Sequence, residues 1–130
     1  LLGRKRPIVG GGHSPGKGKR GWTQQHQHQC ERIAVNTLCQ GSAADLVKMA
    51  MIKLYKGLER ISVHHALSVE TRPWLVLQVH DELLVDTPYV VLDAVHRCMR
   101  KSMEDVFEGL GVKLQVRVHV GEDWGHMRAL

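Results

Sequence analysis

The chain has 130 residues, of which 43% are hydrophobic, and a formal net charge of +5. This length suits one small globular domain with a modest core. No apolar run approaches the roughly 18 residues that cross a membrane, so we expect no membrane partner. The three cysteines lack CxxC spacing, which argues against a disulfide scaffold and favours a soluble protein in a reducing, intracellular compartment: Cys30, Cys39 and Cys98.

The positive charge is concentrated at the start of the chain. Residues 1–20 carry six basic side chains and no acidic one, while the rest of the chain is close to neutral. Such clustering is typical of a segment that contacts a polyanion, although a solvated basic tail would have the same composition. Glycine, proline and serine between Pro7 and Gly21 predict a loop, so we treat residues 1–22 as a basic turn and loop. The start at Leu1, without Met, predicts a piece of a longer protein.

A helix is predicted from about residue 24 to residue 58, with Thr23 as its cap. Its apolar side chains recur at spacings of three and four. Three polar residues, Arg32, Asn36 and Gln40, fall on one stripe because they are four residues apart. A stripe of this kind is often the solvated face of a helix. Uncharged amides and one Arg also suit hydrogen bonds to the DNA minor groove, where the acceptors differ little between base pairs.

A loop over residues 57–73 is expected next, followed by a hairpin over residues 75–85. The hairpin is apolar except at its centre, where His80, Asp81 and Glu82 interrupt the leucines and valines. Buried carboxylates are costly without a partner, so these groups are expected at the tip of a tight turn. On this triplet alone, a solvated acidic turn and a site for metal or substrate are equally good interpretations.

The rest of the chain predicts a helix and a strand. Thr87 and Pro88 form a helix start, and apolar residues then keep helical spacing up to the glycines at 109 and 111. Alternating apolar and polar residues predict a strand over residues 112–120 that pairs with the hairpin. The expected fold is therefore α+β, with a small antiparallel sheet of hairpin and C-terminal strand packed on two helices.

Several short motifs span nearly the whole chain: Gly3-Arg4-Lys5-Arg6, Glu31 to Asn36, Gln40-Gly41-Ser42-Ala43-Ala44-Asp45, Gln78 to Leu84, and Gly121-Glu122-Asp123-Trp124. In this order they resemble the C-terminal palm region of family A DNA polymerases, within a fold shaped like a right hand. The piece Gly41-Ser42-Ala43-Ala44-Asp45, with extra loop length on either side, is more similar to the eukaryotic repair members, polymerases theta and nu, than to bacterial DNA polymerase I. The resemblance implies that residues 23–130 form part of a palm domain in a nuclear enzyme of repair or replication.

The resemblance also implies roles for the candidate residues. Arg32, Asn36 and Gln40 would face the minor groove of the primer-template DNA, which Arg4 and Arg6 would also contact. Asp81 would be one of two aspartates that hold two Mg²⁺ ions during transfer of a deoxynucleoside triphosphate to the primer. Neighbouring residues in an extended strand point to opposite faces, so we expect Asp81 as the metal ligand and Glu82 as an accessory. His80 would lie near the primer end.

One departure from the family pattern concerns the second metal-binding aspartate, which the family carries upstream of the part that this chain matches. We therefore expect the isolated chain to be inactive as a polymerase. Two other classes remain open. One is a non-catalytic nucleic-acid-binding module or degenerate remnant, in which Asp81 has no role. The other is a metal-dependent hydrolase centred on His80 and Asp81, which would need further ligands.

Overall fold

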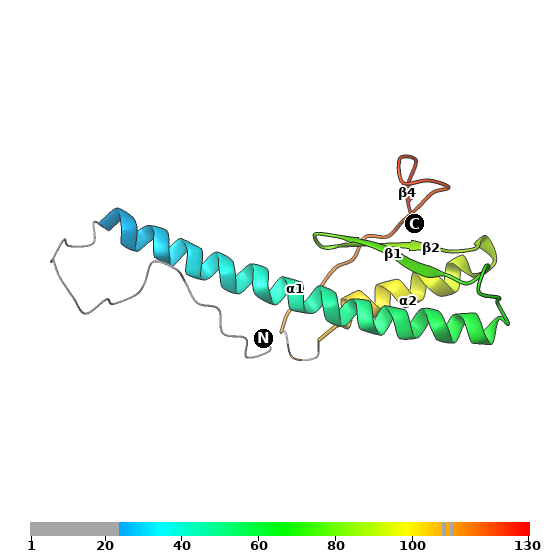
Figure 1. Ribbon diagram of the computed structural model, residues 1–130. Coiled ribbons are helices and arrows are strands. Elements are labelled where there is room, and N and C mark those ends of the chain that lie inside the picture. The colour runs from blue at the N-terminus through cyan, green and yellow to red at the C-terminus, as the bar shows by residue number, and fades with distance from the viewer. Residues whose placement is uncertain (1–23, 108, 110) are drawn as a thin grey trace. The chain divides into compact units, whose positions relative to one another are not determined.

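The computed structural model describes residues 24–107, 109 and 111–130 (Figure 1). The predicted N-terminal loop, the Thr23 cap, Arg4 and Arg6 lie outside the described residues. The chain divides into two compact units, one ending at Asp45 and one from Leu46 to Leu130. The described elements are α1 (Gln24–His64), β1 (Trp74–Val79), β2 (Glu82–Asp86), the 3-10 helix η1 (Tyr89–Val91), α2 (Leu92–Glu104), β3 (His119–Val120) and β4 (Arg128–Ala129).

The first helix is longer than predicted, because Gly57 does not interrupt it. Gly57 is buried against α2, and a Cβ atom added to it would overlap the Sγ atom of Cys98. Glycine is therefore needed here for close packing of the two helices, and the expected loop over residues 57–73 is wrong in its first part.

Helix α1 ends in a Schellman motif. The Leu67 amide donates to the Ser62 carbonyl (2.9 Å) and the Ala66 amide donates to the Val63 carbonyl (3.2 Å), while Ala66 has a φ of 51°. These are the two hydrogen bonds that close a helix end of this type. The left-handed position normally holds glycine, so the alanine carries a conformational cost of about 1–2 kcal/mol.

The core of the second unit lies between the hairpin and the two helices. Strands β1 and β2 are antiparallel, from Trp74 opposite Asp86 to Val79 opposite Glu82, with a bulge between Leu75 and Leu77. Figure 1 shows the hairpin beside α2 and the C-terminal half of α1. The buried apolar residues come from α1, β2, η1, α2 and the segment after α2: Ala50, Leu54, Leu58, Leu83, Val91, Val95 and Val106.

The start of the second helix differs from the prediction. Pro88 is the N-cap of η1 and makes no side-chain cap bond, and α2 begins at Leu92 after Val91. The Thr87 hydroxyl donates to the Pro88 carbonyl (3.4 Å) instead of capping the helix. Helix α2 ends at Glu104, so Val106 belongs to the core without being helical.

The predicted strand over residues 112–120 is confirmed only at its end. The α+β class is confirmed, but β3 pairs with β4, and the hairpin forms a separate two-stranded sheet in the described part of the chain. Burial still alternates from Leu114 to Val120, as the sequence pattern predicts. The segment before β3 instead contacts the end of α2, because the Val116 amide donates a hydrogen bond to the Glu104 carboxylate (3.5 Å). The same carboxylate accepts a hydrogen bond from Arg100 Nε within α2 (3.0 Å).

Candidate active site

The hairpin tip presents the predicted triplet to solvent. Val79 and Glu82 are opposite each other in the β1–β2 pair, so His80 and Asp81 are the two residues of the turn. His80 has a φ of 53°, as the first residue of a tight hairpin turn often requires. The side chains of all three candidate residues, His80, Asp81 and Glu82, are exposed.

Two contacts hold this tip in place. The side-chain amide of Gln78 donates to the His80 carbonyl, which fixes the backbone of the turn from within β1. On the other strand, Leu83 is buried in the core directly after Glu82. Sequence reasoning gave Gln78 no role of its own, although a polar side chain in an apolar strand was the available signal.

Asp81 and Glu82 also line a hollow of about 910 Å³ within the second unit. Its lining comes from the hairpin, from α2 and from the extended segment before β3. Asp81 and Glu82 belong to that lining, together with His96 of α2 and Arg117. The hollow was not predicted, because it depends on where the C-terminal segment passes the hairpin.

The two carboxylates at the hairpin tip could supply some of the ligands that a hard cation such as Mg²⁺ needs. Mg²⁺ takes oxygen ligands and is commonly bound by one or two carboxylates, with water and substrate phosphates completing its coordination. Asp81 and Glu82 offer exposed carboxylates of this kind. Among the residues that the structure describes, no three His, Cys, Asp or Glu side chains gather closely enough to hold a metal ion by themselves.

The predicted polar stripe lies on α1 in the first unit, so it belongs to a different unit from the hairpin tip. Arg32, Asn36 and Gln40 are all exposed. Arg32 and Asn36 line a shallow hollow together with His28, Gln29 and Ile33, which are spaced along the same helix face. The stripe is thus accessible along its length, as a contact surface requires.

Neither helix in the described part of the chain has both the length and the apolar character needed to cross a membrane. The comparison with protein families is positive over almost the whole chain: the model of DNA polymerase family A matches residues 1–126. The chain therefore belongs to family A of the DNA polymerases.

Individual relatives agree with this assignment. The chain is 43% identical over 94 residues to a thermostable DNA polymerase I from Thermus aquaticus, covering 72% of this chain and 10% of the relative. It is 38% identical over 100 residues to a DNA polymerase I from Chloroflexus aurantiacus, covering 77% of this chain and 10% of the relative. It is 35% identical over 102 residues to DNA polymerase theta from Drosophila melanogaster, covering 78% of this chain and 5% of the relative. The chain thus spans a tenth or less of the length of these relatives.

Proposed function

We propose that this chain is part of a DNA-dependent DNA polymerase that adds deoxynucleotides to a primer 3′ end, with residues 23–130 contributing the C-terminal part of the palm. The observation that carries this proposal is the exposed Asp81-Glu82 pair at the tip of a tight hairpin, in a chain that belongs to family A. The substrates would be primer-template DNA and deoxynucleoside triphosphates.

Asp81 is the proposed Mg²⁺ ligand because it occupies the turn itself, where its carboxylate is free of the sheet. Glu82 begins β2 and is paired with Val79, so it takes an accessory position beside the metal. Bound Mg²⁺ would supply charge stabilisation for phosphoryl transfer. His80 lies next to Asp81 in the same turn, and its proposed place is near the primer end.

The polar stripe of Arg32, Asn36 and Gln40, called the amide stripe below, is proposed to contact the DNA minor groove without reading sequence. Arg32, Asn36 and Gln40 are exposed on one face of α1, and each can donate to the acceptors that all base pairs present there. Arg4 and Arg6 are proposed as further DNA contacts on the strength of the sequence motif alone.

A role in nuclear repair synthesis is proposed from the likeness to polymerase theta, whereas the bacterial relatives have the higher identities. The relatives of both groups are DNA polymerases. The subfamily therefore affects the proposed location and pathway, and leaves the proposed reaction unchanged.

The proposal is tested by primer extension with a polymerase polypeptide that includes this chain. Asp81→Asn should abolish extension while primer-template affinity stays within a few fold. Asp86→Asn is the matched control, because Asp86 is an exposed aspartate at the other end of β2. Retained extension by Asp81→Asn would remove Asp81 from the metal site. We propose that the 130-residue chain alone does not extend a primer, because two-metal chemistry needs a further aspartate besides Asp81. Among the described residues, no three His, Cys, Asp or Glu side chains form a metal site by themselves.

The second candidate is a nucleic-acid-binding module without catalysis, which the net charge of +5 and the exposed stripe favour. A module of this kind would bind DNA equally well with or without Mg²⁺ at Asp81. If the longer polypeptide bound primer-template DNA with Mg²⁺ present but did not extend the primer, and Asp81→Asn left that binding unchanged, this alternative would replace the first.

A further inference from the structure

The two helices of the second unit form a basic face on the side away from the hairpin. It consists of Lys53, Lys56 and Arg60 of α1 with Arg97 and Lys101 of α2, and we call these five residues the seam face. All five are exposed. None of them belongs to the hairpin, the acidic pair or the amide stripe.

Two contacts define how the helices cross. Gly57 of α1 lies against the Sγ atom of Cys98 of α2. One turn earlier in α1, Lys53 Nζ donates to the carbonyl of Asp105 at the end of α2 (2.7 Å). Since lower numbers on α1 meet higher numbers on α2, the two helices run antiparallel.

Helical geometry then places the seam face. On α1, Leu54 and Leu58 are buried in the core shared with Leu83 of the hairpin, so they mark the side facing the sheet. Lys56 and Arg60 lie on the opposite flank of Gly57, one turn apart, and Arg60 Nε donates to the Lys56 carbonyl (3.2 Å).

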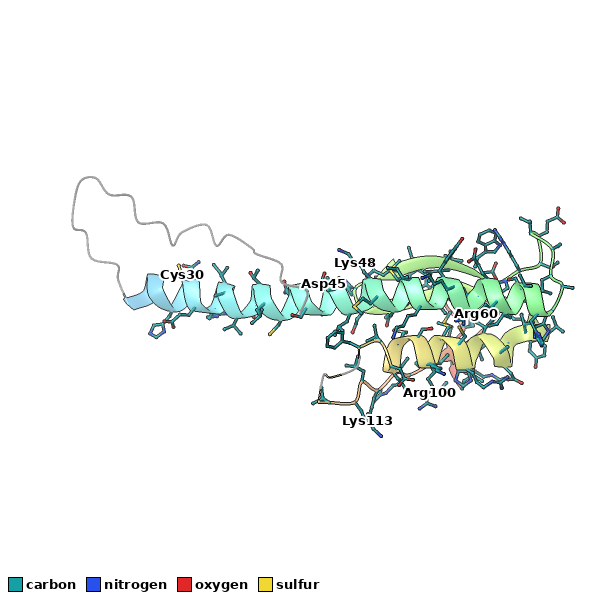
Figure 2. All side chains as sticks on the ribbon, turned by 90° about the horizontal axis from the view of Figure 1, so that it is seen from below. Cys30, Asp45, Lys48, Arg60, Arg100 and Lys113 are labelled. Carbon is teal, nitrogen blue, oxygen red and sulfur yellow. The ribbon has the colours of Figure 1, made fainter. Side chains whose placement is uncertain are left out.

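The same reasoning applies to α2. Val95 is buried on the sheet side of Cys98, while Arg97 and Lys101 fall on its other flank. Because the helices are antiparallel, the outer flanks of both point to the same side. Figure 2 views this side and shows Arg60 at the seam between α1 and α2, with Arg100 further out on α2.

Among the described residues, none of the five basic side chains of the seam face forms an ion pair with a carboxylate. The ion pairs of the second unit, within the described residues, join Arg100 to Glu104 and His126 to Asp123. Lys56 and Arg60 on α1, and Arg97 and Lys101 on α2, are pairs of like charges four residues apart, which repel each other. A bound polyanion would offset this repulsion.

We propose that the seam face binds the phosphate backbone of nucleic acid without sequence specificity, as a second contact separate from the hairpin tip. Lys and Arg side chains are the usual phosphate partners.

The test measures binding of the 130-residue chain to a short fluorescent DNA duplex as the salt concentration is varied. The face variant combines Lys56→Gln, Arg60→Gln and Lys101→Gln. Lys53 is left unchanged because it bonds to Asp105. The control variant removes the same charge from exposed positions elsewhere in the second unit, with Lys48→Gln, Lys113→Gln and Arg128→Gln.

Each lost phosphate contact should lower the slope of log affinity against log salt by about 0.9, so the face variant should lose roughly two to three units of slope. Its low-salt affinity should fall more than tenfold, with the thermal midpoint unchanged or raised. The swap Lys56→Arg with Arg60→Lys should keep the slope, because both residues still carry charge.

Equal losses in the face and control variants would overturn the proposal, since binding would then follow net charge alone. Polyglutamate that competes as well as DNA of equal charge would also overturn it, in favour of an acidic protein partner. The outcome is independent of the proposed catalytic role, because Asp81→Asn should leave this binding unchanged.

Discussion

Replacement of Gly57 by alanine tests the close crossing of α1 and α2 that holds the second unit together. In an exposed helix the change would stabilise by about 1 kcal/mol, through the higher helix propensity of alanine. Here the new Cβ atom would overlap Cys98 Sγ, and overpacking of this kind costs about 1–3 kcal/mol. The two effects oppose each other, so we expect a net loss of about 1 kcal/mol in the free energy of unfolding.

The assay is denaturant unfolding of four proteins: the wild type, Gly57→Ala, Cys98→Ala and the double variant. Removing Cys98 Sγ removes the atom that the new Cβ meets, while the Cys98 Cβ would lie 3.9 Å from it, an ordinary contact. The double variant should therefore be more stable than Cys98→Ala, giving a coupling energy of about 2 kcal/mol. If Gly57→Ala alone stabilised the protein by about 1 kcal/mol, the helices would not cross as closely as described.

Three further predictions concern other parts of the chain. Ala66→Gly should raise the free energy of unfolding by about 1 kcal/mol, because glycine adopts the left-handed φ of 51° without strain; a loss would contradict the helix end described for α1. The hydrogen bond from Arg100 lowers the pKa of Glu104, so its contribution to stability is present above the ordinary carboxyl range and is lost as pH falls through the lowered pKa. Glu104→Gln should flatten the acid side of the stability profile, and Glu122→Gln, at an exposed position, should not. Alanine substitutions in the amide stripe should slow extension past a mismatch more than extension past a correct pair, in single variants of Arg32, Asn36 and Gln40.

The extent of α1 shows what sequence reasoning could and could not supply. Apolar spacing predicted the helix, but glycine is a common helix breaker in sequence, and its effect at Gly57 depends on Cys98, which is 41 positions away in the printed sequence. Only the tertiary structure brings the two together. The end of α1 at His64 could not be predicted for a related reason, since the left-handed position that follows is held by Ala66, and alanine rarely takes this conformation.

Strand pairing shows a second limit. The alternation from Leu114 to Val120 predicted correctly which side chains are more buried, because that follows from the pattern itself. It could not identify the partner strand, which depends on the path of the chain. The hairpin was predicted with the triplet His80, Asp81 and Glu82 at its tip, since charged residues within an apolar ribbon favour a turn; in the structure His80 and Asp81 form the turn and Glu82 begins β2. The hollow beside Asp81 depends on three separate segments and has no local signal.

The most direct measurement of the central claim is a change of metal preference at Asp81. In a polymerase polypeptide that includes this chain, Asp81→Cys should abolish primer extension with Mg²⁺, because a thiolate is a poor ligand for a hard cation. Softer ions such as Mn²⁺ or Cd²⁺ should restore part of the activity, and the same ions should leave Asp81→Ala inactive. Full Mg²⁺-dependent extension by Asp81→Cys would contradict the assignment of Asp81 as a metal ligand.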